Sequence, residues 1–458
     1  MRCIGSMCYV LILALQVLTK HVTNGQLTIL QAAELTKSLL FENSNKLYKL
    51  NLTPVFTPPA ISPINSIPIA PMTQDFTSFL QRHPYIKYIR LQWVDYTNTL
   101  RLRIVTVKQM VKMVEKGSLL AVTRAVLSML QTDQPAEDFS PAGKYNLLPD
   151  WSSLRLCPGA SEPTEEKPQY ASVMCYFRDG AEEADICPRT VLSRALRMVK
   201  KQHDIDVLVG FETEVTFLDK VHLVPISKAH GWCTSRSLQN KCLRVLEQIV
   251  DALEQSGIEV LLFHSESASS QYEIVTGPLP ALESVDALYH IRETIWRICN
   301  HHDIRATLHP KPFPEVAGTA AHMHMSISPP TESFEESFFA GILSHLGSIA
   351  ALTMPMNASY ARLKDSCWAG GTWIAWGEEN REVPLRRVSK ADAHWELRCI
   401  DGLANAYLAL AGVIAAGSIG IAEGAKLPGK SCDGKHFVTF PCVSPPPSPH
   451  FFVRGFQY

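Results

Sequence analysis

The sequence lacks any block of like charge. Lysine and arginine number 43 against 44 aspartates and glutamates in 458 residues, and no basic tract interrupts this balance. Proteins that bind nucleic acid or anionic membranes concentrate positive charge, so we expect neither partner. The chain also has no internal repeat and no G-x-G-x-x-G loop, so we do not expect a nucleotide held by such a loop.

The sequence lacks a C-x-x-C pair as well. Its 12 cysteines are scattered through apolar segments such as VMCYF and RICNHH. This distribution is typical of reduced thiols inside a core rather than of a disulfide framework or a zinc site. It favours a cytoplasmic protein.

Long hydrophobic runs are scarce, and the exception lies at the N-terminus. Residues 1–26 hold one arginine ahead of an apolar run that is too short to span a membrane but matches the length of a signal-peptide core. No A-x-A cleavage site follows it. A secretory leader, a buried helix and an artefact of the gene model all stay open for this segment.

The remaining chain predicts an α+β protein. Residues 27–50 have helical apolar spacing, and the proline-rich residues 51–72 predict a stiff linker. Residues 86–107 predict a β-hairpin that turns at Asp95 to Thr99, with Asn98 in a left-handed conformation. Beyond the polar loop 159–169, strand patterns alternate with helices expected at 190–202, 238–256, 284–301, 335–353 and 404–422. Residues 428–458 form an atypical tail without periodicity.

One predicted strand, VLVGFETEVTFL, carries two glutamates two residues apart. Alternation along a strand places Glu212 and Glu214 on one face, where their carboxylates converge. Like charges held close in a partly desolvated place require a raised pKa, a cation or arginines. A solvated face on an edge strand is the alternative.

Five further segments carry polar residues of the same kinds, most of them in pairs. They supply the carboxylates Glu266, Glu273 and Glu396, the imidazoles His322 and His324 ahead of Ser326, and the guanidinium groups of Arg362, Arg381, Arg386 and Arg398. Each pair alone is ordinary. Together, oxygen-rich ligands suit Mg²⁺ or Mn²⁺, and arginines suit phosphate and carboxylate oxygens. The combination predicts phosphoryl-transfer chemistry on a nucleotide triphosphate.

The order of these segments resembles the glutamine synthetase family from about Thr73 to Leu427. The matching pieces are VDYTN, LLPDWSSLR, GFETEV, ESASSQYEI, PKPFPEVAGTAAHMHMS, SYARL, NRE, LRR and WELR. The resemblance implies a small β-grasp domain at residues 73–168. It implies a catalytic domain at 169–427 with a curved antiparallel sheet, a half-barrel, surrounded by helices.

The resemblance also implies a ligand set for two Mg²⁺ or Mn²⁺ ions. One ion would be held near the acid substrate by Glu214, Glu266 and Glu273. The other would be held at the ATP phosphates by Glu212, His322 and Glu396.

Roles in substrate binding follow from the same resemblance. His324, Ser326 and Arg386 would contact ATP, and Gly318, Arg362 and Arg398 would contact glutamate or an analogue. Arg381 and Arg386 would stabilise the transferring phosphoryl group. Asp95 would reach the site of a neighbouring subunit and help deprotonate the incoming ammonia or amine, because sites in this family form between subunits of stacked rings.

Three departures from the family pattern affect the expected substrate. Trp368 replaces a loop glutamate of glutamine synthetases proper, Ala317 replaces an asparagine, and SASSQ replaces a Pro-Gly turn. The stretch CWAGGTWIAWGEENRE is similar to a fungal and plant branch that is sometimes fused to an amidohydrolase domain, of which residues 27–50 would be a remnant.

Three hypotheses remain from the sequence. The first is an ATP-dependent glutamate–ammonia or glutamate–amine ligase that acts through a γ-glutamyl phosphate. The second is a γ-glutamyl-amine ligase for a larger nitrogen donor, which Trp368 favours. The third is a non-catalytic assembly, which the retained carboxylates disfavour, since buried charges without cations are costly.

Overall fold

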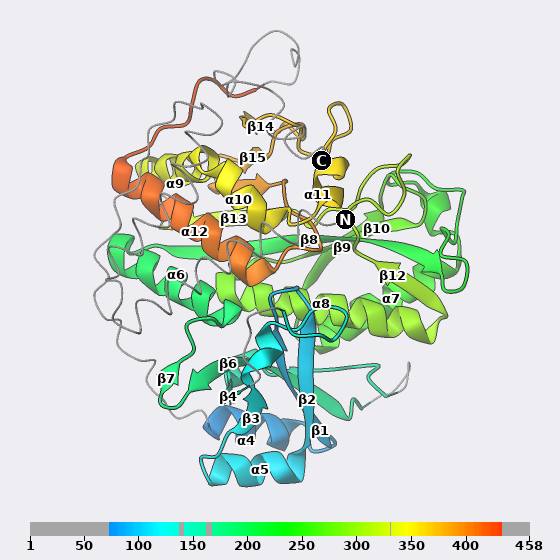
Figure 1. Ribbon diagram of the computed structural model, residues 1–458. Helices are drawn as coiled ribbons and strands as arrows, with labels where there is room; N and C mark the ends of the chain where they lie inside the picture. The colour runs from blue at the N-terminus through cyan, green and yellow to red at the C-terminus, as the bar shows by residue number, and fades with distance from the viewer. Residues whose placement is uncertain (1–72, 137–141, 162–166, 330, 433–458) are drawn as a thin grey trace. The chain divides into compact units, whose positions relative to one another are not determined.

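The computed structural model of the protein describes residues 73–136, 142–161, 167–329 and 331–432. All of them fall within one unit of the chain, Pro68–Ser444. They form two β-sheets with associated helices (Figure 1). The predictions made for residues 1–72 and 433–458 lie outside the described residues.

The N-terminal sheet has the strand order β2-β1-β6-β4-β3, with β5 and β7 also paired to β6. Its elements are α4 (Thr73–Arg82), β1 (Tyr88–Val94), β2 (Leu100–Thr106), α5 (Val107–Glu115), β3 (Leu120–Thr123), β4 (Lys144–Pro149), β5 (Arg155–Leu156), β6 (Tyr170–Asp179) and β7 (Glu182–Glu183). Apolar residues that alternate along β1 are buried in a core with Phe76 of α4, which stacks on Trp151. The sheet therefore has its own hydrophobic core.

The hairpin of β1 and β2 forms as predicted. Asn98 has a φ of 62°, the left-handed conformation that an asparagine tolerates well. The Asp95 carboxylate accepts hydrogen bonds from the backbone N–H groups of Thr97 and Thr99, at 2.9 and 3.0 Å. This aspartate therefore closes the turn of its own hairpin.

The expected boundary at residues 168 and 169 does not separate the two sheets. It falls before β6, which pairs in parallel with β1 and antiparallel with β4. The second sheet begins only with β8 (Asp206–Asp219), after α6 (Pro188–His203). The N-terminal sheet thus extends about 15 residues beyond the predicted boundary, to β7.

The second sheet is a curved half-barrel in which all but one strand pair are antiparallel. Its order is β14-β15-β16-β13-β8-β10-β9, with β11 and β12 also on β8. The remaining strands are β9 (Val260–Ser265), β10 (Gln271–Thr276), β11 (Leu279–Pro280), β12 (Ile304–Thr307), β13 (Met323–Ser328), β14 (Trp376–Glu378), β15 (Leu385–Ser389) and β16 (His394–Leu397). The β14–β15 pair is parallel. The α+β class and the half-barrel are confirmed.

Helices surround this sheet. Those at predicted places are α7 (Lys241–Gln255), α8 (Ala281–His301), α9 (Glu332–Ser344), α10 (Leu346–Thr353) and α12 (Ala406–Glu423), and a further short helix, α11 (Asn357–Arg362), was not predicted. The single helix expected at 335–353 is divided at His345 into α9 and α10. Helices α7 and α8 pack on apolar residues of β8 and β10, and Figure 1 shows α9 and α12 lying next to one another.

Among the described helices, α12 alone is long and apolar enough to cross a membrane. However, 61% of this window is buried inside the protein, which is typical of a core helix. Six described cysteines are buried free thiols, as predicted, whereas Cys233 and Cys367 are exposed and Cys432 is disulfide-bonded.

Candidate active site

The strand β8 lies inside the half-barrel sheet, and its neighbours bring the predicted residues together. Glu214 of β8 pairs with Glu273 of β10, and His324 of β13 pairs with Glu396 of β16. Since β8 has partners on both edges, the alternative of a solvated edge strand is wrong. The cleft is lined by Glu212, Glu214, Trp232, His264, Glu266, Ser267, Glu273, Ala317, Gly318, Ala320, His322, Arg362, Cys367, Trp368, Ala369, Arg381, Arg386 and Arg398.

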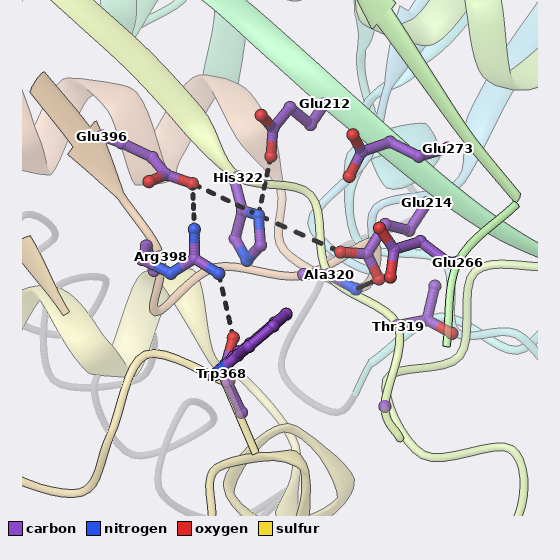
Figure 2. Close-up of polar contacts among 12 residues, drawn as sticks. Glu212, Glu214, Glu266, Glu273, Thr319, Ala320, His322, Trp368, Glu396 and Arg398 are labelled. Carbon is purple, nitrogen blue, oxygen red and sulfur yellow. Dashed lines mark hydrogen bonds and ion pairs between the residues drawn. The ribbon is translucent and has the colours of Figure 1, made fainter. Parts of the chain in front are cut away.

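Two histidines bridge carboxylates from different strands. His322 Nδ1 lies 2.8 Å from Glu212 Oε2 and 3.4 Å from Glu396 Oε1 (Figure 2). His324 Nε2 lies 2.9 Å from Glu212 Oε1, and its Nδ1 lies 2.7 Å from His394 Nε2. Glu212 is therefore shared between both imidazoles.

The glutamates of the cleft differ strongly in charge preference. Burial favours the neutral form of Glu212, but hydrogen bonds to His322 and His324 hold its pKa well below its usual range. Burial and the nearby carboxylates of Glu266 and Glu273 raise the pKa of Glu214 well above its usual range. Burial raises the pKa of Glu273 to about 7. Glu214 and Glu273 therefore tend to hold protons around neutral pH, because the cationic groups of the protein do not balance their charges.

His264 is a residue of the cleft that was not predicted from the sequence. Its Nε2 lies 3.1 Å from Glu273 Oε1, and this contact raises the pKa of His264 to about 9. The signal was present in the stretch FHSES, where His264 and Glu266 alternate like the other polar pairs of the cleft. Its proximity to Glu273 depends on the pairing of β9 with β10, which no local pattern reveals.

The donor atoms fit hard divalent cations. Three groups each bring their ligand atoms within 4.8 Å of one another: Glu212, His324 and Glu396; Glu212, Glu273 and His322; and His264, Glu266 and Glu273. His322 Nε2 is buried without a hydrogen-bond partner, so it is available to a ligand. Each group offers two carboxylates and one imidazole, and such mostly oxygen donors suit Mg²⁺ or Mn²⁺.

These groups divide the residues differently from the resemblance. Glu212 belongs to two of them, His324 stands where His322 was expected beside Glu396, and His264 stands where Glu214 was expected. Glu214 Oε2 accepts hydrogen bonds from Gln271 Nε2 and the Ala320 N–H, at 2.9 and 2.8 Å. The assignment of ligands to two separate ions stays a prediction.

The four predicted arginines all line the same cleft. Arg386 and Arg398 both bind Glu396, the former with Nη1 at 2.9 Å. Arg362 is buried and donates to the Arg398 carbonyl at 3.0 Å, and burial lowers the pKa of Arg362. Arg381 is exposed. Three guanidinium groups are thus fixed by the fold, and the fourth lies at the rim.

Gly318 is a position at which the fold admits no side chain. A Cβ there would lie 2.3 Å from Arg362 Cγ and 2.5 Å from the Pro310 carbonyl oxygen. The Gly318 carbonyl accepts a hydrogen bond from Gln271 Nε2 at 2.8 Å. Backbone is therefore exposed to the cleft here, as the predicted role in substrate binding requires.

Asp95 and Ser326 are not among the residues that line the cleft. Asp95 is fully buried, and its Oδ2 accepts a hydrogen bond from Arg101 Nε at 2.5 Å. Within its own chain its carboxylate is occupied by the hairpin. Its role at a neighbouring subunit and the contact of Ser326 with ATP stay predictions.

The stretch GAKLPGKS at 424–431 matches the phosphate-loop pattern G-x-x-x-x-G-K-[ST]. Such a loop follows a strand and opens a helix, whereas Gly424 here ends α12 with a φ of 61°. Ser431 Oγ accepts a hydrogen bond from the Glu378 N–H at 2.8 Å instead. The segment therefore matches the pattern in sequence only, and its structure is not that of a phosphate-binding loop.

Trp368 lines the cleft from the loop that follows α11. Its carbonyl accepts a hydrogen bond from Arg398 Nη2 at 2.9 Å, which Figure 2 shows. A second tryptophan, Trp232, packs against it edge to face, with ring centroids 5.8 Å apart. The sequence reasoning singled out Trp368 but missed Trp232, which lies in a loop without any recognisable pattern.

Comparison with known proteins identifies the family of the chain. A family model described as glutamine synthetase, catalytic domain, matches residues 185–439, which is more than half of the chain. The chain therefore belongs to the glutamine synthetase family, and named relatives include ligases of glutamate with amines.

Individual relatives cover different parts of the chain. Protein fluG of Emericella nidulans is 37% identical over 428 residues, 91% of this chain but 48% of that protein, so this chain spans about half of its length. A glutamate–methylamine ligase of Methyloversatilis universalis is 29% identical over 361 residues, 73% of this chain and 78% of that protein. A γ-glutamylpolyamine synthetase, GlnA3, of Streptomyces coelicolor is 32% identical over 313 residues, 63% of this chain and 65% of that protein.

A solved structure supports the fold. The structure of a GmaS–ADP complex has a TM-score of 0.68 and 22% sequence identity, and it covers 78% of this chain and 83% of that chain.

Proposed function

We propose that the protein is an ATP-dependent ligase that joins the side-chain carboxylate of glutamate, or a close analogue, to ammonia or an amine. The observation that carries the proposal is one cleft that four arginines share with the carboxylates and imidazoles of Glu212, Glu214, His264, Glu266, Glu273 and His322. Multivalent negative charge for cations and fixed positive charge for phosphate are what phosphoryl transfer requires.

The proposed reaction has two steps. In the first, a carboxylate oxygen of glutamate attacks the γ-phosphorus of ATP, a P–O bond forms, and ADP leaves with the electron pair of the broken bond. In the second, the nitrogen attacks the acyl carbon of the γ-glutamyl phosphate. A C–N bond forms, the C–O bond to phosphate breaks, inorganic phosphate leaves, and the amine proton passes to solvent.

Each group of the cleft has a part in this scheme. The carboxylates and imidazoles of the three clusters would hold Mg²⁺ or Mn²⁺, which supplies charge neutralisation for the ATP phosphates when bound. Arg381, exposed at the rim, is free to approach the transferring phosphoryl group. The Gly318 backbone and the buried Arg362 would orient the acid substrate, because both are fixed by the fold.

We further propose a cytoplasmic homo-oligomer of stacked rings with sites between subunits. The chain's membership in the glutamine synthetase family supports this arrangement. In such an assembly Asp95, at the turn of β1 and β2, would act from a neighbouring subunit.

The test is phosphate release by the purified full chain with ATP, Mg²⁺, glutamate and either ammonium or an amine, with the amide identified by mass spectrometry. Glu214→Gln and Arg381→Ala should each lower turnover by about 10²–10³-fold, as expected when charge stabilisation of a transition state is lost. Glu423→Gln and Arg305→Ala, at exposed positions outside the cleft, serve as matched controls. Unchanged turnover in the cleft variants would contradict the proposal.

A further inference from the structure

Two tryptophans that no role in phosphoryl transfer explains stand at the mouth of the cleft. Trp232 and Trp368 are 51% and 56% exposed, although indoles normally bury most of their surface. Their rings meet edge to face at an interplanar angle of 83°, and both line the cleft that holds the carboxylates. An exposed aromatic pair beside a binding cleft indicates a surface for a ligand.

The loop of Trp368 is held in place by the site itself. Trp368 has a φ of 54°, a left-handed conformation that is rare for a bulky residue. Its N–H donates to Glu382 Oε1 at 2.7 Å, and its carbonyl accepts from Arg398 Nη2 at 2.9 Å. A strained backbone conformation persists only where surrounding contacts stabilise it. The two hydrogen bonds therefore fix the backbone of Trp368 and the position from which its indole extends.

The loop of Trp232 is fixed in a similar way. The Cys233 N–H donates to the Ser265 carbonyl at 2.9 Å, and Ser265 Oγ donates to the Gly231 carbonyl at 2.9 Å. Ser265 is the last residue of β9, directly before Glu266. Both indoles are therefore positioned by residues next to the predicted ligands.

The charged and uncharged residues that line the cleft indicate the chemical groups of the ligand. Four carboxylates line the cleft, those of Glu212, Glu214, Glu266 and Glu273, and Glu266 hydrogen-bonds to the Trp232 side chain. The lining also includes the uncharged residues Ser267, Ala317, Cys367 and Ala369. A ligand that fits has a cationic head for the inner end and an apolar body for the aromatic mouth.

We propose that Trp232 and Trp368 select a primary monoamine with an apolar alkyl or aryl group as the nitrogen donor. This inference rests on the proposed ligase function. Ammonia makes no apolar contact and gains nothing from the indoles. An alkyl chain lies against them and gains about fourfold in kcat/KM for each buried methylene, and an ammonium group gains further from the ring faces. A diamine would place a second ammonium group against the indoles, and the loss of water around that charge costs more free energy than the burial of a methyl group.

The experiment measures kcat/KM for ammonium, methylamine, butylamine and 1,4-diaminobutane, with saturating ATP, Mg²⁺ and glutamate. For the unaltered chain, butylamine should be the best of the four. Trp232→Ala and Trp368→Ala should each lower the butylamine value by about tenfold or more through KM, and change the ammonium value by less than about threefold. Trp368→Phe should restore most of the loss. Trp296→Ala is the control, because Trp296 is 42% exposed on α8 and does not line the cleft.

Binding is read separately, by calorimetric titration of butylamine into the protein with Mg²⁺, glutamate and a non-hydrolysable ATP analogue. Binding that both tryptophan variants weaken supports the aromatic mouth, even if no amide forms, in which case the ligase proposal fails. Two outcomes would overturn the proposed role of Trp232 and Trp368 and leave the ligase proposal standing. The first is amide formation that is fastest with ammonium or 1,4-diaminobutane, and the second is amide formation from butylamine that is equally fast in the tryptophan variants.

Discussion

Glu212 and Glu273 lie on neighbouring strands of one sheet yet have opposite charge preferences. Two imidazoles hydrogen-bond to Glu212 and keep its pKa well below the usual range. Burial raises the pKa of Glu273 from 4.5 to about 7, although His264 hydrogen-bonds to it. Removing water favours the neutral acid, and only a sufficient number of hydrogen-bonding or cationic partners reverses this. The inner cleft therefore takes up protons or cations around neutral pH.

This difference predicts a pH-dependent effect of metal on stability. A carboxyl group whose pKa is raised on folding contributes stability that is present below its unfolded pKa and is lost as the pH rises through its folded pKa. For Glu273 that window runs from 4.5 to about 7. The raised pKa of His264, about 9, acts in the same direction at higher pH.

We therefore expect the metal-free protein to lose stability between about pH 5 and pH 8, and Mg²⁺ or Mn²⁺ to restore it by replacing the protons. Melting temperatures with EDTA and with metal should differ more at pH 8 than at pH 6. Glu273→Gln should make the difference less dependent on pH. An equal metal effect at both pH values would contradict this explanation.

The sequence predicted most residues of the cleft individually but not all of their neighbours. Pairs such as Glu212 with Glu214 are visible because alternation along a strand is a local property. His264 and Trp232 escaped because their positions depend on strand pairing and on a loop path. Asp95 shows the reverse case, in which a predicted site residue also has a structural role that only the turn geometry reveals.

Helices α6, α8 and α12 meet at one buried arginine. Arg189 Nε and Nη2 contact the two oxygens of Asp286 at 3.0 and 2.7 Å, and Nη2 also contacts Asp150 Oδ2 at 2.7 Å. The Tyr407 hydroxyl donates to Asp286 Oδ1 at 2.5 Å. This network joins the half-barrel helices to the loop that follows β4 of the N-terminal sheet.

Arg189→Met should lower the free energy of unfolding by about 3–5 kcal/mol, because it leaves the buried Asp286 without its cation. Arg194→Met on the same helix is the matched control. Arg194 pairs with Glu183 and Asp185 with 31% of its side chain exposed, and such pairs contribute about 1 kcal/mol or less. Urea unfolding of both variants measures the difference. Equal losses in the free energy of unfolding for the two variants would show that burial does not determine how much the Arg189 network stabilises the protein.

The strand β6 could be predicted from its sequence, but its pairing with β1 and β4 could not. Helices α6, α7, α8 and α12 were predicted within a few residues because their periodicity is local, whereas α4, α5 and α11 were not predicted. The polar loop 159–169 resembled a domain boundary, yet β6 returns to pair with β1 and β4. A strand's pattern shows that it is a strand and which face is apolar, but it does not identify its partners.

The chain as a whole combines an N-terminal sheet with a half-barrel that carries the cleft. The order of motifs along the sequence was sufficient to predict the α+β class and the half-barrel, because the motifs from GFETEV onward supply strands and loops of the cleft. The composition of the mouth was not predictable in the same way. It depends on Trp232 and Trp368, which are 136 positions apart in the sequence and meet only in the folded chain.

The most direct test of the ligase proposal follows an oxygen atom. Glutamate labelled with oxygen-18 in its side-chain carboxylate is supplied with ATP, Mg²⁺ and butylamine or ammonium, and the released phosphate is analysed by mass spectrometry. Activation through a γ-glutamyl phosphate transfers one labelled oxygen to each phosphate released with the amide. Amide formation with unlabelled phosphate, or phosphate release that does not require glutamate, would contradict the account.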